Sequence, residues 1–138
     1  MNITIIDGQG GQLGAQLVKE IAEKLPNAEI TAIGTNSIAT SAMLKAGAKN
    51  VATGENSVVV ACRKADVIIG PVGIVIADSL LGEITDKMAV AVGRADAVRI
   101  LIPMNKCDNF VAGIQNMNTK TLIDDAVMKL RSISSQKC

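Results

Sequence analysis

The chain of 138 residues lacks histidine, tyrosine and tryptophan, and Phe110 is its one aromatic residue. The absence of histidine excludes His general bases, nucleophiles activated by a histidine partner, and His-ligated zinc. The near absence of aromatic side chains excludes a stacking platform for single-stranded nucleic acid. Any chemistry must therefore use carboxylates, lysine, cysteine, hydroxyl groups or a bound cofactor.

Charge of one sign, cysteine pairs and long apolar runs are also missing. Fourteen Lys and Arg balance thirteen Asp and Glu, which predicts no nucleic acid and no membrane as partner. Cys62, Cys107 and Cys138 form no CxxC pair, which is typical of a reducing cytoplasm. The longest apolar stretch, 67–77, is too short to span a bilayer. We expect a cytoplasmic protein without a signal peptide and without a metal.

Hydrophobic residues make up 49% of the chain, enough for a sizeable core. The length predicts a single domain over residues 1–138. Strands and helices are expected in alternation along it. The expected strands lie at 2–7, 29–33, 50–52, 66–69 and 97–102, with a short sixth at 110–114. The expected helices lie at about 13–25, 37–46, 55–64, 73–81, 85–92 and from a cap at Thr121 onward. A strand over 74–76 is the alternative to the helix at 73–81.

This alternation predicts an α/β fold, because short apolar strands that are each followed by a helix form a parallel sheet covered on both faces. We expect a doubly wound, mostly parallel sheet of five to six strands, a Rossmann-like three-layer sandwich. Ligands of such sheets bind beyond the carboxyl ends of the strands, where the strand order reverses.

The strongest chemical signal is the glycine-rich loop between the first strand and the first helix. Glycines at 8, 11 and 14 form a G-x-x-G-x-x-G array. Such glycines allow a tight turn, close approach of a pyrophosphate and close packing of helix on sheet. The helix N-terminus offers amides and a partial positive charge to a phosphate. The candidate nucleotide-binding residues are Gly8, Gln9, Gly10, Gly11, Gln12, Leu13, Gly14, Thr35, Asn36, Ser37, Gly70 and Pro71. The alternative is a tight turn that binds nothing.

The loop resembles the cofactor loop of extended and atypical short-chain dehydrogenases and of other NAD(P)-binding Rossmann domains, over about residues 2–37. That resemblance implies NAD or NADP as cofactor. The chain departs from it where Leu13 breaks the strict G-x-G-x-x-G spacing. Thr35 and Asn36 stand where an Asp or Glu holds the ribose, and no tyrosine supplies a Tyr-x-x-x-Lys pair.

Across its length the chain also resembles an uncharacterised family of small bacterial proteins, a domain of unknown function. The resemblance rests on IDGQGGQLG (6–14), AIGTNSIATSAMLKAGA (32–48), ATGEN (52–56), IIGPVGIVIA (68–77), GEIT (82–85) and ILIPMNKC (100–107). It implies a cytoplasmic bacterial protein with a Rossmann-like fold and carries no activity.

Polar residues near the ends of strands are further candidates. Asp7 fits either a ribose or metal-phosphate contact or a cap for nearby backbone amides, and Glu55 fits either a helix cap or an acid/base role. Asp78 and Glu83 flank the apolar segment and form a candidate carboxylate pair. Lys106 beside Cys107 is a candidate for a reactive thiolate.

Segment 72–81 is apolar nearly all round, so a helix there must be buried on every side. This predicts a partner subunit, and hence a homo-oligomer, most simply a two-fold dimer. Three functions remain open at this point: a nucleotide-dependent oxidoreductase with an interface active site, a non-catalytic nucleotide-binding or partner-binding module, and a structural oligomer with an empty loop.

Overall fold

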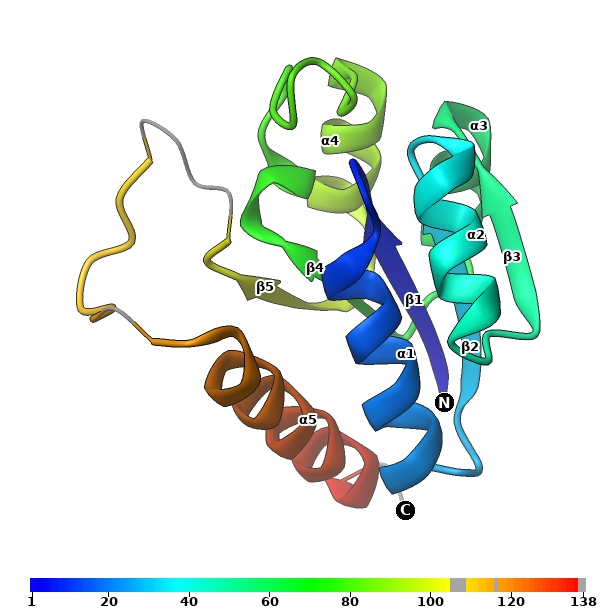
Figure 1. Cartoon of the computed structure of the whole chain (residues 1–138), viewed down its shortest axis with the longest axis vertical. Coiled ribbons are helices and arrows are strands. Elements are labelled where there is room, and N and C mark those ends of the chain that lie inside the picture. Colours follow the sequence, from blue (N-terminus) through cyan, green and yellow to red (C-terminus); the bar gives the residue numbers. More distant parts are fainter. Residues whose placement is uncertain (105–108, 116, 137–138) are drawn as a thin grey trace.

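The computed structural model describes residues 1–104, 109–115 and 117–136 (Figure 1). Strands and helices alternate along the chain as the periodicity predicts. A short 3-10 helix, η1, follows the fourth strand. The order is β1 (Asn2–Asp7), α1 (Gln12–Lys24), β2 (Glu29–Gly34), α2 (Ser37–Lys45), β3 (Asn50–Thr53), α3 (Glu55–Cys62), β4 (Val67–Pro71), η1 (Val72–Val75), α4 (Asp86–Arg94), β5 (Val98–Ile102) and α5 (Thr119–Gln136).

The five strands form one parallel sheet in the order β3-β2-β1-β4-β5. The chain first builds outward from β1 to β3 and then returns to the other side of β1. The strand order therefore reverses between β1 and β4, and this switch point is where α/β sheets bind ligands. The α/β fold class is confirmed, with five strands in the sheet.

Helices cover both faces of the sheet (Figure 1). On one face, residues of α1, α2 and α5 form one core together with Ile3 and Ile5 of β1. On the other face, α3, α4 and η1 pack on Ile6, Ile33 and Ile68. The side chains of β1 alternate between these two cores because successive strand residues point to opposite faces.

Polar side chains cap the first turns of two helices. The Asn36 side chain accepts a hydrogen bond from the Ala39 amide at 2.9 Å at the start of α2. Thr85 does the same for the Met88 amide at 3.2 Å at the start of α4. For α5 the expected cap at Thr121 is wrong, because Asn118 accepts from the Thr121 amide at 2.8 Å.

The helix expected over 73–81 is wrong. Only residues 72–75 are helical, as η1, and a series of turns follows. Asp78, Leu80 and Leu81 have positive φ angles of 66°, 55° and 56°, which no α-helix contains. Ile74 and Leu80 are buried within this chain, while Leu81 is 94% exposed. The apolar character therefore reflects burial in turns, and the argument for a dimer based on a fully buried helix fails.

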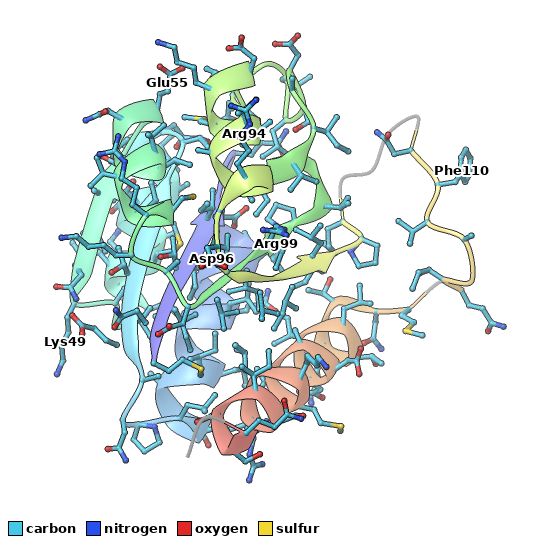
Figure 2. The ribbon with its side chains drawn as sticks, turned by 180° about the vertical axis from the view of Figure 1, so that it is seen from behind. Lys49, Glu55, Arg94, Asp96, Arg99 and Phe110 are labelled. Carbon is cyan, nitrogen blue, oxygen red and sulfur yellow. The ribbon has the colours of Figure 1, made fainter. Side chains whose placement is uncertain are left out.

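The expected sixth strand at 110–114 is also wrong, since these residues form a turn at 112–113 and no strand of the sheet. Phe110 lies 91% exposed on this segment and points away from the sheet and helices (Figure 2). A strand requires a partner strand for its backbone, and the segment lies apart from β5.

Two polar side chains are buried in the described part of the chain, Thr4 and Asp7, which are 3% and 5% exposed. Both lie on the central strand β1. Burial of a polar group is costly unless a partner satisfies it. Among the described residues, no buried side-chain nitrogen or oxygen lacks a hydrogen-bond partner.

Candidate functional site

Three loops meet at the carboxyl end of β1 and β2, and the carboxylate of Glu83 lies among them. The Gln9 amide donates to both oxygens of Glu83, at 3.2 and 3.1 Å. The Thr35 hydroxyl donates to Glu83 Oε1 at 2.9 Å, and Asn36 Nδ2 donates to the same oxygen. Asn36 Nδ2 also donates to the Gln9 carbonyl at 3.0 Å. We call Gln9, Thr35, Asn36 and Glu83 the polar cluster.

The polar cluster changes the ionisation of Glu83. Partial burial acts to raise the pKa of its carboxyl, but the hydrogen bonds from Asn36, Thr35 and Gln9 favour the charged form. The net result is a pKa below the ordinary value. Glu83 is therefore an anion at neutral pH. Its carboxylate lies at the end of β2, where Rossmann folds carry an Asp or Glu and this chain has Thr35 and Asn36.

Replacing Glu83 with glutamine should lower the free energy of unfolding by about 1 kcal/mol at pH 7, because the side chain is partly exposed and loses charge-assisted bonds. A lowered pKa in the folded state gives stability that is present above the unfolded pKa and lost as pH falls through the folded pKa. In urea titrations, the loss of unfolding free energy caused by Glu83→Gln should therefore become smaller toward pH 3. An equal deficit at pH 3 and pH 7 would contradict this ionisation.

The carboxylate of Asp7 accepts hydrogen bonds from two backbone amides of the glycine-rich loop. Its Oδ1 accepts from the Gly8 amide at 2.8 Å and its Oδ2 accepts from the Gly14 amide at 2.7 Å. Burial raises the pKa of the Asp7 carboxyl, although both amides act to lower it and Glu83 adds a small further increase. The interpretation of Asp7 as a cap for backbone amides agrees with this geometry.

Packing explains three glycines of the loop. A Cβ on Gly11 would lie 2.7 Å from Ala39 Cα, and Gly11 has a positive φ of 73°. A Cβ on Gly14 would lie 2.9 Å from Asp7 Cβ, and one on Gly8 would lie 2.6 Å from Thr35 Oγ1. These glycines let α1 approach α2 and the sheet, the helix-packing role that the array predicts. Gly10 is different, because a Cβ there would have its nearest neighbour 4.0 Å away.

The start of α1 offers free hydrogen-bond donors. The Gly11 amide donates to the Gly8 carbonyl at 2.9 Å, and Asp7 holds the Gly14 amide. Within the described part of the chain, no group accepts from the amides of Gly10, Gln12 or Leu13. Gly10 and Gln12 are exposed, so an anion in solution can reach their amides.

The remaining candidates are not members of the polar cluster. Ser37 is the first residue of α2, next to the polar cluster. Gly70 and Pro71 are buried at the end of β4, and a Cβ on Gly70 would lie 2.3 Å from the Ile6 carbonyl oxygen. The position of Gly70 is therefore explained by contact with β1, whereas Pro71 pairs with Ile102 of β5. Glu55 lies in the first turn of α3 and points outward (Figure 2).

The structure does not bring Asp78 and Glu83 together in one site. Asp78 is exposed in the turn, whereas Glu83 belongs to the polar cluster. The candidate thiolate Cys107 and its neighbour Lys106 lie outside the described residues. Cys62 is a buried cysteine, and burial raises the pKa of its thiol to about 11. No sequence signal marked Glu83 as the partner of Thr35 and Asn36, since it comes from a segment with no readable periodicity.

Metal-binding clusters and membrane-spanning helices are both absent from the described ranges. There, no three His, Cys, Asp or Glu side chains gather in a way that could hold a metal ion. None of the helices in the same ranges has the length and apolar character needed to cross a membrane.

Comparison with known proteins places the chain in a family. Comparison with curated proteins gives no match. The fold is similar to a solved structure described as a dodecameric FMN-dependent UbiX-like decarboxylase from Escherichia coli O157:H7. The two chains share 13% identity over 98% of this chain and 94% of that chain, with a TM-score of 0.45. The model of the family described as a domain of unknown function (DUF3842) matches residues 2–135, and the chain belongs to this family.

Proposed function

We propose that this protein binds a nucleotide at the carboxyl edge of β1 and β2. The phosphate is held by the amides of Gly10, Gln12 and Leu13, which lack partners in the described chain. Amides at a helix start, together with the helix dipole, form an anion site without a side-chain cation. The observation that carries the proposal is that these free amides lie beside the polar cluster at the switch-point edge of the sheet.

Glu83 supplies the acceptor for the ribose. Nucleotide-binding Rossmann folds use an acid at the end of the second strand to accept from ribose hydroxyls. Here Glu83 reaches the same end of β2 through Thr35 and Asn36. Among the described residues, its Oε2 accepts only from the Gln9 amide, so it retains a lone pair for a hydroxyl group. Because Glu83 is negative, it favours a free ribose diol over the 2′-phosphate of NADP.

One nucleotide fits this edge better than two. The second half of a dinucleotide crosses the switch point between β1 and β4. On that side, Leu80 lies against Gly8, where a Cβ would be 3.0 Å from Leu80 Cδ1. The turns before α4 lie above the end of β1 (Figure 1). We therefore propose a mononucleotide such as AMP as the ligand class, ahead of NAD.

Thermal shift and calorimetric titration with AMP, ATP, FMN, NAD and NADP test this function. A ligand at a hundredfold excess over its Kd stabilises the folded state by roughly 2.7 kcal/mol. Gly10→Asp places a carboxylate beside the amides and should weaken AMP binding at least tenfold, whereas Gly10→Asn should bind like the wild type. Loss of binding in both variants, or equal binding in both, would contradict an anion at these amides. If none of the five ligands raises the Tm, the proposed function fails.

A further inference from the structure

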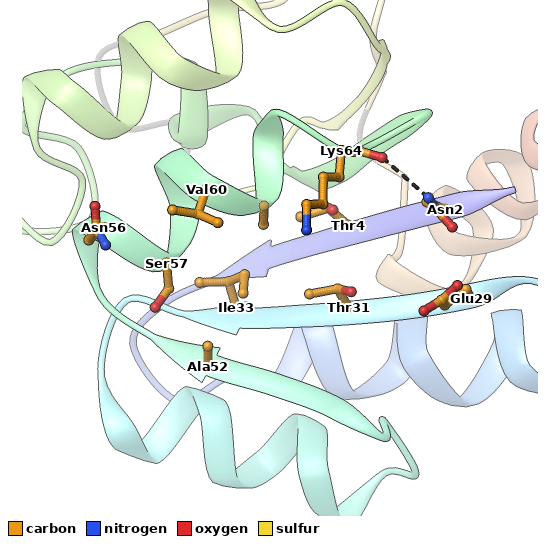
Figure 3. A pocket seen from close by; sticks show the side chains of 11 residues that line it. Asn2, Thr4, Glu29, Thr31, Ile33, Ala52, Asn56, Ser57, Val60 and Lys64 are labelled. Carbon is orange, nitrogen blue, oxygen red and sulfur yellow. Dashed lines mark hydrogen bonds between the residues drawn. The ribbon is translucent and has the colours of Figure 1, made fainter.

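The grooves that border the sheet differ in their lining. Beneath α3, the groove over β1 and β2 is lined mostly by polar and charged side chains, among them Glu29, Thr31 and Lys64 (Figure 3). A groove of about 430 Å³ between β5 and α5 is lined mostly by apolar side chains instead. We call it the β5–α5 groove. Because β5 is the last strand of the sheet, this groove presents apolar surface at the edge of the molecule.

Large apolar side chains that face solvent gather around the β5–α5 groove. Met128 on α5 is 69% exposed, and Met117 and Ile114 before the helix are 49% and 38% exposed. Phe110 and Val111, on the same segment as Ile114, are exposed as well, and Phe110 points away from the sheet and helices (Figure 2). Single exposed apolar residues are normal, but a group of them around one apolar groove marks an interaction surface.

Two opposite charges beside the groove indicate what covers it. Asp125 and Lys129 lie one turn apart on α5 and line the groove together with Met128. Lys120 and Asp124 have the same spacing on the same helix and form a salt bridge at 2.8 Å. Among the described residues, by contrast, Asp125 and Lys129 form no salt bridge with each other or with another side chain. Both charges are therefore available to a partner.

A second copy of the chain complements this pair of charges. When two α5 helices pack antiparallel about a two-fold axis, Asp125 of each copy lies opposite Lys129 of the other. An isologous interface has this property, because residue i contacts residue j and j contacts i. The two Met128 side chains then meet near the axis, between the two pairs of charges. The net charge of +1 leaves little repulsion between the copies.

We propose that the chain forms a two-fold dimer through α5 and the β5–α5 groove. Apolar contacts of Met128, Met117 and Ile114 supply affinity at the centre, and the two Asp125–Lys129 pairs select the antiparallel arrangement. These grounds are independent of segment 72–81, which lies outside the interface. The interface is also separate from the proposed nucleotide site and does not depend on it.

Sedimentation equilibrium of the full-length protein at pH 7 tests the proposal. We expect a dimer of the wild type at high micromolar concentration. Asp125→Lys and Lys129→Asp each place like charges at both contacts, so each variant alone should dimerise at least tenfold more weakly. An equimolar mixture of the two should restore the dimer, because two lysines of one copy then face two aspartates of the other. Met128→Ser should weaken the dimer at least tenfold.

The control is Lys120→Asp, which reverses a charge on the side of α5 beside α1 and should dimerise like the wild type. Far-UV circular dichroism of every variant separates a lost contact from a lost fold. A wild-type chain that stays monomeric at high micromolar concentration would overturn the proposal. So would unchanged dimerisation of both charge variants, a mixture that dimerises no better than either variant alone, or a folded Met128→Ser variant with wild-type affinity.

Discussion

Gly11→Ala is expected to lower the free energy of unfolding by about 3 kcal/mol or more, since left-handed backbone costs a non-glycine residue about 1–2 kcal/mol and overpacking about 1–3 kcal/mol. The added Cβ would lie 2.7 Å from Ala39 Cα and 2.9 Å from its carbonyl oxygen. Both are backbone atoms of α2, so no side-chain rotation relieves the contact. Urea or guanidinium titration, with far-UV circular dichroism as the signal, measures the change.

Gly10→Ala is the matched control, one residue away in the same loop. Gly10 lacks a positive φ, and its added Cβ has room. Its stability should stay within about 0.5 kcal/mol of the wild type, as is usual for surface changes. Similar losses in the two variants would show that α1 and α2 do not approach closely at Gly11.

The second large effect is expected at Asp7. Asp7→Ala leaves the buried amides of Gly8 and Gly14 without their acceptor, which costs about 1–3 kcal/mol for each unsatisfied group. We therefore expect a loss of about 3 kcal/mol in the free energy of unfolding, measured by urea titration at pH 7. Asp7→Asn keeps one acceptor oxygen and should lose less than Asp7→Ala.

The pH dependence at Asp7 has the opposite sign to that at Glu83. Burial raises the pKa of Asp7 in the folded state. The stability that this shift contributes is fully present below the pKa of Asp7 in the unfolded chain, and it is lost as pH rises through the pKa in the folded state. Asp7→Asn removes this loss, and its stability relative to the wild type should improve from pH 3 to pH 7. A relative stability that worsens over the same range would contradict the raised pKa.

Much of the fold follows from patterns that a sequence displays directly. β1 is a run of β-branched residues that are buried on both faces, and α1 carries an apolar stripe that faces the core at Leu17 and Ile21. Both patterns arise because buried side chains recur at a fixed interval, about 2 residues in a strand and 3.6 residues in a helix. The glycine loop follows as well, because a tight turn and close packing each require the absence of a side chain.

The candidate site could be predicted only in part. Strand ends placed Thr35 and Asn36 beside the glycine loop, since the carboxyl ends of parallel strands share one edge. Glu83 could not be assigned to them, because it arrives from turns whose backbone includes left-handed residues such as Leu80 and Leu81. Such turns have no period, so the sequence does not reveal which side chains they direct inward.

The central place of β1 in the sheet has a consequence for how the chain folds. β1 can pair with β2 once the chain has been synthesised past residue 34. The other edge of β1 stays unpaired until β4 has been synthesised. The contact between Asn2 and Asp66 closes across 64 positions, and such distant pairings slow folding. During that interval, a nascent chain holds an incomplete sheet with an unpaired edge on its central strand, a surface open to aggregation or to a chaperone.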